Sequence, residues 1–250
     1  MTDMALLVDL HKRQARQGPG SEVDTLRALA LTGLSDKGDL RIADIGCGTG
    51  ASTLTLATAL HGEITAVDFL PEFLEELETQ TVGAGLEQRI RPLQASMDQL
   101  PLEEETLDLI WSEGAIYNMG FEQGLAAWRP LLKPAGILAV SEITWLVNSR
   151  DDEIQSFWEQ AYPQIDTAAG KFQALERQGY SPIGYFPLPI SSWMDNYYQP
   201  LAASFESFLQ RHHHSEAARE VVAEHQEEQA LYEKYSAQYS YGFYVARKSD

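Results

Sequence analysis

Short apolar runs alternate with amphipathic segments between residues 40 and 146. One amphipathic segment repeats its apolar residues at helical spacing, with Leu70, Phe73, Leu74 and Leu77 on one face and acidic residues between them. Short strands separated by amphipathic helices are typical of a parallel sheet covered by helices. The pattern therefore predicts an α/β fold with five core strands, which are Arg41–Ile45, Ile64–Asp68, Ile90–Ala95, Leu107–Ser112 and Ile137–Ile143.

A proline in the third predicted strand constrains the order of the sheet. Pro92 has no backbone N–H to donate to a neighbouring strand, so this strand should lie at a sheet edge. A doubly wound sheet whose order starts 3-2-1-4 places its third strand at the edge. The proline is therefore compatible with a doubly wound, mostly parallel sheet.

Helical patterns flank this core on both sides. Before it, Ser21 followed by Asp24 is typical of a helix N-cap and indicates an N-terminal helical segment. After it, the runs Gly184–Ile190 and Tyr241–Ala246 read as strands, with a helical pattern between them. We expect one domain, with an N-terminal helical cap (1–39), a core (40–146) and a C-terminal part (147–250) whose residues 197–239 form a helical insertion over the sheet.

Charge excludes one class of partner. Lys and Arg total 18 against 37 Asp and Glu, which gives a formal net charge of −19. Nucleic-acid affinity comes largely from basic side chains that neutralise phosphates, and the sequence contains no basic stripe. We therefore expect a small-molecule partner and no nucleic acid.

The sequence gives only coarse indications of the cellular compartment and of the oligomeric state. No apolar run approaches the roughly 20 residues of a membrane span, and the N-terminus lacks a secretory pattern. Cys47 is the single cysteine, so an internal disulfide is excluded. These features favour a cytoplasmic protein without membrane insertion. The aromatic content permits a homodimer, although no pattern demands one.

The most informative motif lies where the first predicted strand ends. Asp44-Ile45-Gly46-Cys47-Gly48-Thr49-Gly50 precedes a predicted helix from Ala51 to Leu60. The glycines allow a sharp turn and a close approach of the backbone to a ligand, and the helix N-terminus presents free N–H groups. Taken alone the loop is ambiguous, because nucleotide-binding oxidoreductases use a related one.

Two acidic residues narrow the choice of ligand. Asp44 stands two residues before the first glycine, where a carboxylate suits an ammonium group and opposes a pyrophosphate. Asp68 ends the second strand, where a carboxylate can accept hydrogen bonds from both hydroxyls of a ribose. Capping of the following helix is the alternative for Asp68. Together the two acids favour a nucleoside attached to an amino acid.

With these residues in view, the chain resembles the class I S-adenosylmethionine-dependent methyltransferases over roughly residues 40–146. Its match is similar to the ubiquinone/menaquinone-biosynthesis-type subgroup and to uncharacterised bacterial members. The resemblance implies a seven-stranded sheet whose last strand, Tyr241–Ala246, is antiparallel. The matching segments are Asp44 to Gly50, Val67-Asp68, Gln99-Leu100-Pro101-Leu102, Leu107-Asp108-Leu109-Ile110 and Leu132-Lys133-Pro134-Ala135-Gly136.

The resemblance also assigns residues to the cofactor. It implies that the glycine loop, Cys47 included, wraps the methionine part with Asp44 near its amino group, that Asp68 holds the ribose, and that Phe69 lies beside the adenine. Many relatives have Asp where this chain has Ser96-Met97, so Ser96 is expected to replace that adenine contact more weakly. The cofactor-binding residues are predicted to be Asp44, Gly46, Cys47, Gly48, Gly50, Asp68, Phe69, Ser96, Met97 and Glu113.

Catalytic residues are less clearly indicated. Glu113 and Tyr117 follow the fourth strand, and Glu142 lies near the end of the fifth, on the side where open α/β sheets bind ligands. They are weak candidates, since packing or capping explains each of them nearly as well. Three consecutive histidines, 212–214, make a poor single-metal site, and we expect a solvated patch and no metal.

These features lead to one preferred function and two rivals. The sequence favours transfer of a methyl group from S-adenosylmethionine to a small molecule, with S-adenosylhomocysteine as the other product and the acceptor atom open between carbon, oxygen, nitrogen and sulfur. A non-catalytic protein with the same fold is one alternative. A nicotinamide-dependent oxidoreductase is the other, and Asp44 and the glycine spacing disfavour it.

Overall fold

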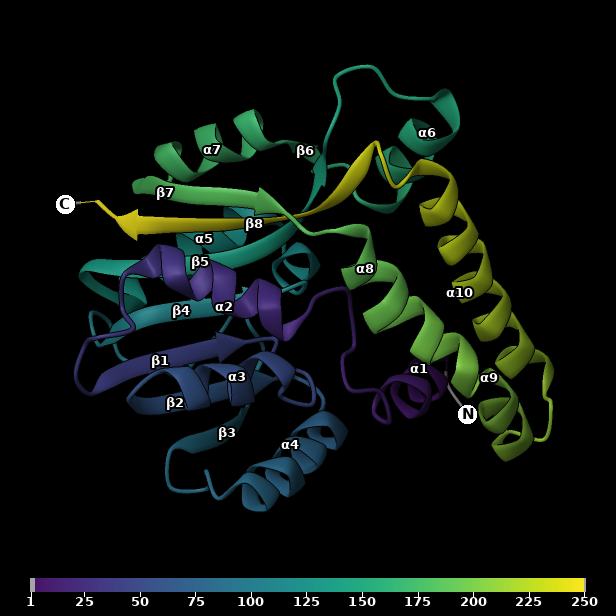
Figure 1. Cartoon of the computed structure of the whole chain (residues 1–250), viewed down its shortest axis with the longest axis horizontal. Coiled ribbons are helices and arrows are strands. Elements are labelled where there is room, and N and C mark those ends of the chain that lie inside the picture. Colours follow the sequence, from purple (N-terminus) through teal and green to yellow (C-terminus); the bar gives the residue numbers. More distant parts are fainter. Residues whose placement is uncertain (1–2, 250) are drawn as a thin grey trace.

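The computed structural model describes the backbone of residues 3–249 and the side chains of residues 4–249 (Figure 1). Its centre is one twisted sheet. The strands are β1 (Leu40–Ile45), β2 (Gly62–Asp68), β3 (Ile90–Gln94), β4 (Leu107–Glu113), β5 (Leu132–Trp145), β6 (Asp166–Thr167), β7 (Tyr180–Pro187) and β8 (Tyr239–Lys248). Seven of them lie in the order β3-β2-β1-β4-β5-β8-β7, and β6 pairs with β5 beside this path.

The predicted doubly wound sheet is confirmed. β1 to β5 are parallel neighbours, and β8 is antiparallel to both β5 and β7, as the resemblance implied. β3 lies at the edge, so Pro92 faces no second strand that needs its N–H. The two-residue strand β6 was missed, because two residues cannot show an alternating pattern.

Two layers of helices cover the sheet. The alternation along β1 sends Ile42 to one face and Ala43 and Ile45 to the other. The first face packs against α2 (Glu22–Thr32), α3 (Ala51–Ala59) and α4 (Pro71–Ala84), and the second against α5 (Phe121–Trp128) and α7 (Ala168–Arg177). This three-layer arrangement fixes the carboxyl ends of the parallel strands at one edge of the molecule.

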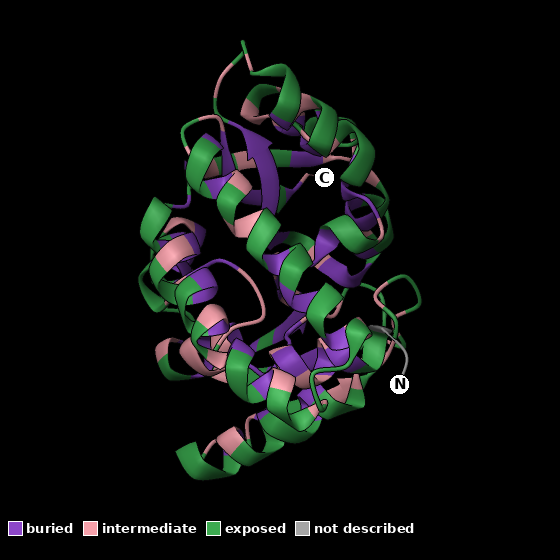
Figure 2. Cartoon of the chain, turned by 90° about the vertical axis from the view of Figure 1, so that its right-hand side faces the viewer, coloured by how far each residue is buried: buried purple, intermediate pink, exposed green. Residues whose placement is uncertain are grey.

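A cap of helices lies beyond those strand ends (Figure 1). It has its own apolar core, in which the rings of Trp193 and Tyr232 stack with centroids 4.3 Å apart and an interplanar angle of 14°. Figure 2 shows the buried residues on the inner faces of these helices and the exposed ones outside. The cap consists of α1 (Asp3–His11), α6 (Asp152–Ala161), α8 (Ile190–Trp193), a π-helical segment (Met194–Tyr198), α9 (Gln199–Arg211) and α10 (Glu216–Tyr235).

The predicted helical insertion is present between β7 and β8, and its helices span Ile190 to Tyr235 rather than residues 197–239. The two helices in the expected N-terminal cap of residues 1–39 pack in different parts of the structure. Leu6 and Leu10 of α1 pack in the cap core, whereas Ala28 and Leu29 of α2 pack in the core of the sheet. Ser21 is the N-cap of α2, as predicted, and its side chain accepts a hydrogen bond from the backbone N–H of Asp24 at 3.0 Å.

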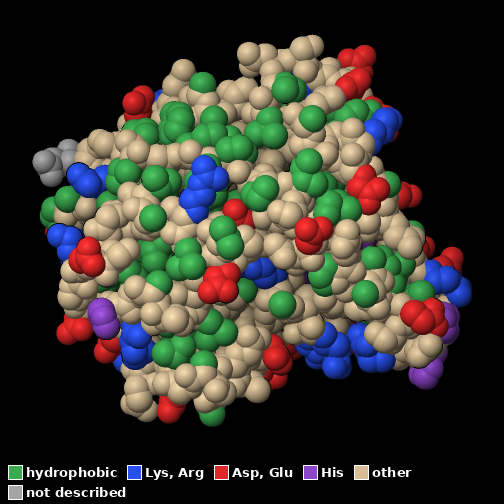
Figure 3. Space-filling model, in the orientation of Figure 1, with side chains coloured by type: hydrophobic (Ala, Val, Ile, Leu, Met, Phe, Trp, Pro, Cys, Tyr) green, Lys and Arg blue, Asp and Glu red, His purple; other side chains and the backbone are tan. Residues whose placement is uncertain are grey.

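Surface features add little chemistry outside the cavity. On the face in Figure 3, Lys and Arg occur in small groups among Asp and Glu. His212 to His214 lie in the turn between α9 and α10, where Nε2 of His212 is 3.0 Å from Oδ2 of Asp9. Within the described residues, no cluster of His, Cys, Asp and Glu side chains is arranged to hold a metal ion.

Among the described residues, no helix has the length and apolar content that are needed to span a bilayer.

Candidate active site

A cavity of about 960 Å³ lies where the sheet meets the cap. Its walls come from the loops after β1, β2, β3 and β4, from α1 and the segment that follows it, and from Tyr197 of the cap. Ligand pockets usually enclose roughly 300–1,000 Å³, so this cavity has room for a cofactor and a second small molecule. It lies at the carboxyl ends of the parallel strands, the side on which open α/β sheets bind ligands.

The glycine loop forms one wall of the cavity. Gly46 and Gly48 both line it and both have positive φ, 74° and 55°. A Cβ on Gly46 would lie 2.3 Å from the Cβ of Ala115, so no larger residue fits there. Cys47 also lines the cavity, and burial raises the pKa of its thiol well above the usual range, which argues against a nucleophilic role.

Gly50 has a different role from the other two glycines. It does not line the cavity, and a Cβ there would lie 2.2 Å from Cδ1 of Leu77 on α4. The structure therefore gives Gly50 a packing function, which lets the start of α3 approach α4. Its predicted contact with a cofactor has no support in this geometry.

Asp44 lies behind the loop rather than in the cavity. The residue is fully buried, and its Oδ2 accepts hydrogen bonds from Ser52 Oγ at 2.8 Å and Thr53 Oγ1 at 2.6 Å. Its Oδ1 is buried without a hydrogen-bond partner. A buried acceptor without a partner is unfavourable, so this oxygen suits a nearby positive group of a bound ligand.

The titration of Asp44 gives a testable pH dependence of stability. Burial raises its pKa from the ordinary 3.8 to about 7, although hydrogen bonds from Thr53 and Ser52 oppose the shift. Because the folded-state pKa is the higher one, the stabilising contribution is complete below about pH 4 and is lost as the pH rises through about 7. The free energy of unfolding, measured in urea, should therefore fall over this range relative to Asp44→Asn, which does not titrate. A constant difference between the two proteins would contradict this assignment.

Asp68 and Phe69 line the cavity after β2, as predicted. The Asp68 carboxylate accepts hydrogen bonds from the backbone N–H of Gly48 at 2.9 Å and of Leu70 at 3.0 Å. Burial raises its pKa, and these backbone hydrogen bonds partly counter that effect. The Phe69 side chain is 68% exposed, so its ring is available to a planar group. Asp68 thus joins the two loops while its carboxylate stays at the cavity wall.

Ser96 and Met97 also line the cavity, and the structure adds Asp98 to them. The Ser96 hydroxyl donates a hydrogen bond to Oδ1 of Asp98. The resemblance pointed to Ser96-Met97 and did not indicate that the carboxylate of the next residue, Asp98, reaches the same wall. Its place just before Gln99-Leu100-Pro101 was the available signal.

The three catalytic candidates separate in the structure. Glu113 lines the cavity, and it accepts hydrogen bonds from Arg16 Nη1 at 2.8 Å, Thr25 Oγ1 at 2.6 Å and Trp111 Nε1 at 3.0 Å. Tyr117 lines the cavity from a short 3₁₀ turn after β4, with 40% of its surface exposed. Glu142 does not line it and instead pairs with Lys171 inside the protein, so the expectation that Glu142 faces the reaction pocket is not met.

Two residues of the N-terminal segment were not predicted. Gln17 lies over the glycine loop, where its Oε1 accepts a hydrogen bond from the backbone N–H of Thr49 at 2.9 Å and its Nε2 donates to Thr49 Oγ1 at 3.0 Å. His11, the last residue of α1, lines the cavity on the side of the cap. Both residues reach the site through contacts with segments that are distant in the sequence, so no local sequence pattern indicates them.

Fold and site together define a class of protein. A doubly wound sheet with an antiparallel last strand, a glycine loop after β1 and an acid at the end of β2 form an α/β protein with the class I methyltransferase architecture. Residues 42–136 match the family model described as a methyltransferase domain. This segment is therefore similar to methyltransferase domains, and curated relatives named as methyltransferases match parts of the chain.

Curated relatives agree with this family and differ in what they act on. The chain is 35% identical over 125 residues to a ubiquinone/menaquinone biosynthesis C-methyltransferase of Syntrophotalea carbinolica, covering 49% of this chain and 50% of that protein. It is 31% identical over 102 residues to a dimethylglycine N-methyltransferase of Parasynechococcus marenigrum, covering 40% and 36%. An uncharacterised protein of Haemophilus influenzae is 22% identical over 189 residues, which is 66% of this chain and 74% of that one. The match thus spans half or less of the two named enzymes.

Solved structures extend the likeness to the whole fold. A methyltransferase from Geobacter sulfurreducens in complex with S-adenosylhomocysteine aligns over 97% of both chains with a TM-score of 0.84 at 16% identity. The (4+2)-cyclase SpnF aligns over 98% of this chain and 94% of its own, with a TM-score of 0.77 at 20% identity. At these identities the likeness concerns the fold alone, and the same fold occurs in a protein described as a cyclase.

Proposed function

We propose that this chain binds S-adenosylmethionine in the cavity and directs methyl transfer to a small-molecule acceptor. The observation that carries the proposal is the bare backbone of Gly46 and Gly48 beside the Asp68 carboxylate, at the carboxyl ends of β1 and β2. This arrangement suits a ligand that combines a ribose with an amino acid. The unpartnered Oδ1 of Asp44 behind the loop suits that ligand's ammonium group.

The protein's own residues act chiefly by holding and enclosing the reactants. S-adenosylmethionine, when bound, supplies a methyl group that is already activated by positively charged sulfur. Asp68 and the glycine loop would hold the nucleoside and amino-acid parts, with Phe69, Ser96 and Met97 on the adenine side. Alignment of the two reactants and exclusion of water then provide most of the acceleration, since no further activation of the donor is needed.

Calorimetry tests the cofactor, and a labelled methyl group tests the reaction. We expect micromolar binding of S-adenosylmethionine and S-adenosylhomocysteine and no binding of NAD(H), because Asp44 opposes a pyrophosphate. Transfer of a labelled methyl group to an acceptor from a small-molecule panel would then establish turnover. Failure of folded protein, checked by a cooperative melt, to bind either cofactor form would overturn the proposal.

The second candidate function is cofactor-dependent binding or other chemistry without methyl transfer. The fold that this chain shares with the (4+2)-cyclase SpnF supports this second candidate. Tight binding of S-adenosylhomocysteine together with no methyl transfer to any acceptor in the panel would favour this candidate. The cytoplasmic location, the homodimer and the absence of nucleic-acid binding remain predictions from the sequence.

We expect the N-terminal segment and the cap to close over the cofactor. Gln17 holds the segment after α1 onto the glycine loop through Thr49, and α1 in turn packs against α9 and α10. Binding of S-adenosylhomocysteine should slow amide hydrogen exchange in residues 12–20 and in α9. Gln17→Ala should weaken binding about fivefold, or about 1 kcal/mol, because it frees the glycine loop that two hydrogen bonds between Gln17 and Thr49 hold in place. Unchanged exchange in both segments on cofactor binding would contradict the closure.

A further inference from the structure

A pair of histidines, His11 and His225, lies where the cap meets the cavity, and of the two only His11 lines the cavity. His11 ends α1 and His225 lies in α10, and their Nε2 atoms are 3.0 Å apart although the residues are separated by 214 positions. His225 is buried, with 9% of its surface exposed. The His11 ring is nearly parallel to that of Tyr197, at an interplanar angle of 15°. The pair is therefore held in place by three elements of the cap.

The hydrogen bonds of the pair fix its tautomers. Nδ1 of His225 lies 2.8 Å from the carbonyl oxygen of Val221, which can only accept, so Nδ1 carries a proton. Its Nε2 must then accept from His11, so His11 carries its proton on Nε2. Burial, with His225 nearby, lowers the pKa of His11 to about 4, so the ring is neutral at neutral pH. Nδ1 of His11 is left with a free lone pair.

That lone pair has no use within the protein. Nδ1 of His11 is buried and has no hydrogen-bond partner, while the residue itself lines the cavity. An unpaired buried acceptor costs about 1–3 kcal/mol, so such atoms are usually kept for a ligand or for chemistry. A molecule that reaches this atom must present a hydrogen-bond donor to it.

The other residues that line the cavity near His11 indicate what kind of molecule can bind there. Apolar side chains of α1 and the aromatic rings of Tyr117 and Tyr197 line it. Among the described side chains that line the cavity, the charged ones are Arg16, Asp68, Asp98 and Glu113. Arg16 and Glu113 neutralise each other at 2.8 Å, and the two aspartates follow β2 and β3, on the side of the predicted cofactor residues. Of the described residues that line the cavity, none near His11 thus offers an unpaired charge to an ionic acceptor; the Glu228 carboxylate lies behind the lining, where it accepts a hydrogen bond from the Tyr198 hydroxyl.

We propose that the acceptor is an uncharged, largely apolar molecule with a reacting hydroxyl, and that His11 orients this hydroxyl by accepting its hydrogen bond at Nδ1. The hydroxyl oxygen forms the new bond to the methyl carbon as the methyl–sulfur bond breaks with its electron pair left on sulfur, and the hydroxyl proton passes to water, because burial makes the His11 ring a weak base. His225 is a positioning residue, because it keeps the His11 lone pair on Nδ1 by accepting from Nε2. The inference rests on the proposed function.

Ring-nitrogen NMR combined with calorimetry tests the inference on the whole chain. Protein saturated with S-adenosylhomocysteine is titrated with phenol, benzoate and benzylamine, which share a ring and are neutral, anionic and cationic at neutral pH. We expect phenol to bind at least about tenfold more tightly than the other two, a difference of about 1.4 kcal/mol, and to shift the Nδ1 resonance of His11. Preferred binding of benzoate or benzylamine, or no response of Nδ1 to phenol, would overturn the proposal.

Variants separate the roles of the two histidines. His11→Phe and His11→Gln should lose phenol affinity while S-adenosylhomocysteine affinity stays unchanged, and the melt of each reports its folding. His225→Gln keeps an oxygen acceptor and should preserve the His11 tautomer, whereas His225→Leu should let the proton move between the ring nitrogens. His214→Asn is the matched control, since His214 is exposed in a turn with a φ of 48°. If the unaltered protein does not bind S-adenosylhomocysteine at all, the proposed function itself is overturned, and not only the role of His11.

Discussion

Replacing Asp68 by alanine should weaken S-adenosylhomocysteine binding by about a hundredfold. Two hydrogen bonds from ribose hydroxyls to a carboxylate contribute about 1.5 kcal/mol each or more, so their loss amounts to about 3 kcal/mol. The carboxylate also anchors the backbone N–H groups of Gly48 and Leu70, and the glycine loop should loosen as well. Calorimetric titration with S-adenosylhomocysteine measures the effect directly.

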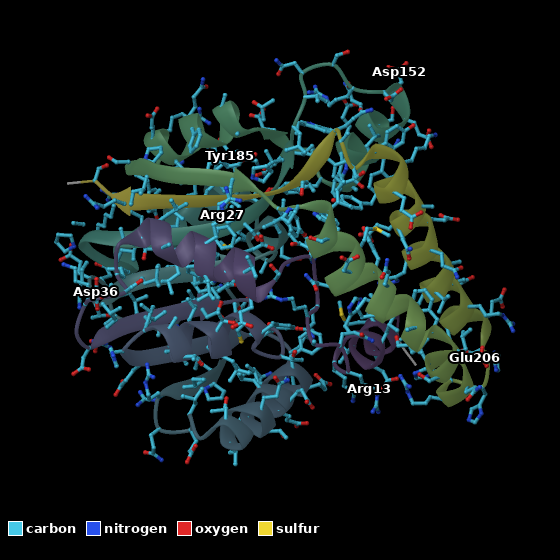
Figure 4. All side chains as sticks on the ribbon, in the orientation of Figure 1. Arg13, Arg27, Asp36, Asp152, Tyr185 and Glu206 are labelled. Atoms are coloured by element: carbon cyan, nitrogen blue, oxygen red, sulfur yellow. The ribbon has the colours of Figure 1, made fainter. Side chains whose placement is uncertain are left out.

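Two further variants make this result interpretable. Asp68→Asn keeps an acceptor for one partner and should lose less affinity than the alanine variant. Asp36→Ala is the control, because Asp36 is exposed and lies at the opposite end of the sheet from α1 and the cap (Figure 4). Unchanged affinity in Asp68→Ala, with an intact cooperative melt, would mean that the ribose is held elsewhere.

The glycine loop and the strand that leads to it could be predicted because their signals are local. A strand, a sharp turn and a helix start follow each other within residues 40–60, and each needs a particular residue type at a particular position. Pro92 gave the position of β3 in the same way, through a single missing N–H. Such constraints depend on the backbone of one segment, so the sequence of that segment displays them.

Contacts between distant segments could not be predicted in this way. Gln17 meets Thr49 and His11 meets His225 only because the chain folds α1 back between the glycine loop and the cap. The same limitation affected two positions of the glycine motif. The structure places the Asp44 carboxylate behind the loop, with one oxygen still without a hydrogen-bond partner, and it packs Gly50 against Leu77. Membership of a motif predicted the neighbourhood of these residues but not their contacts.

Replacing Lys171 by methionine should destabilise the protein by about 3–5 kcal/mol, the usual cost of leaving a buried charge without its partner. Nζ of Lys171 lies 3.1 Å from Oε1 of Glu142, and the two side chains are 2% and 0% exposed. The ammonium also donates to the carbonyl oxygen of Gln164 at 2.8 Å and lies 4.5 Å from the ring centroid of Phe121. Urea unfolding of the variant measures the loss.

A paired substitution separates structural from catalytic use of Glu142. Lys171→Met combined with Glu142→Leu removes both charges and should recover most of the lost stability, since apolar pairs of similar volume replace buried ion pairs well. Lys234→Met, which breaks the exposed pair with Glu153, is the matched control and should change stability little. If the double variant is stable and still transfers methyl groups, Glu142 serves the fold alone. A stable double variant that binds the cofactor but has lost methyl transfer would return Glu142 to the chemistry, because only then would its carboxylate be needed beyond its ion pair.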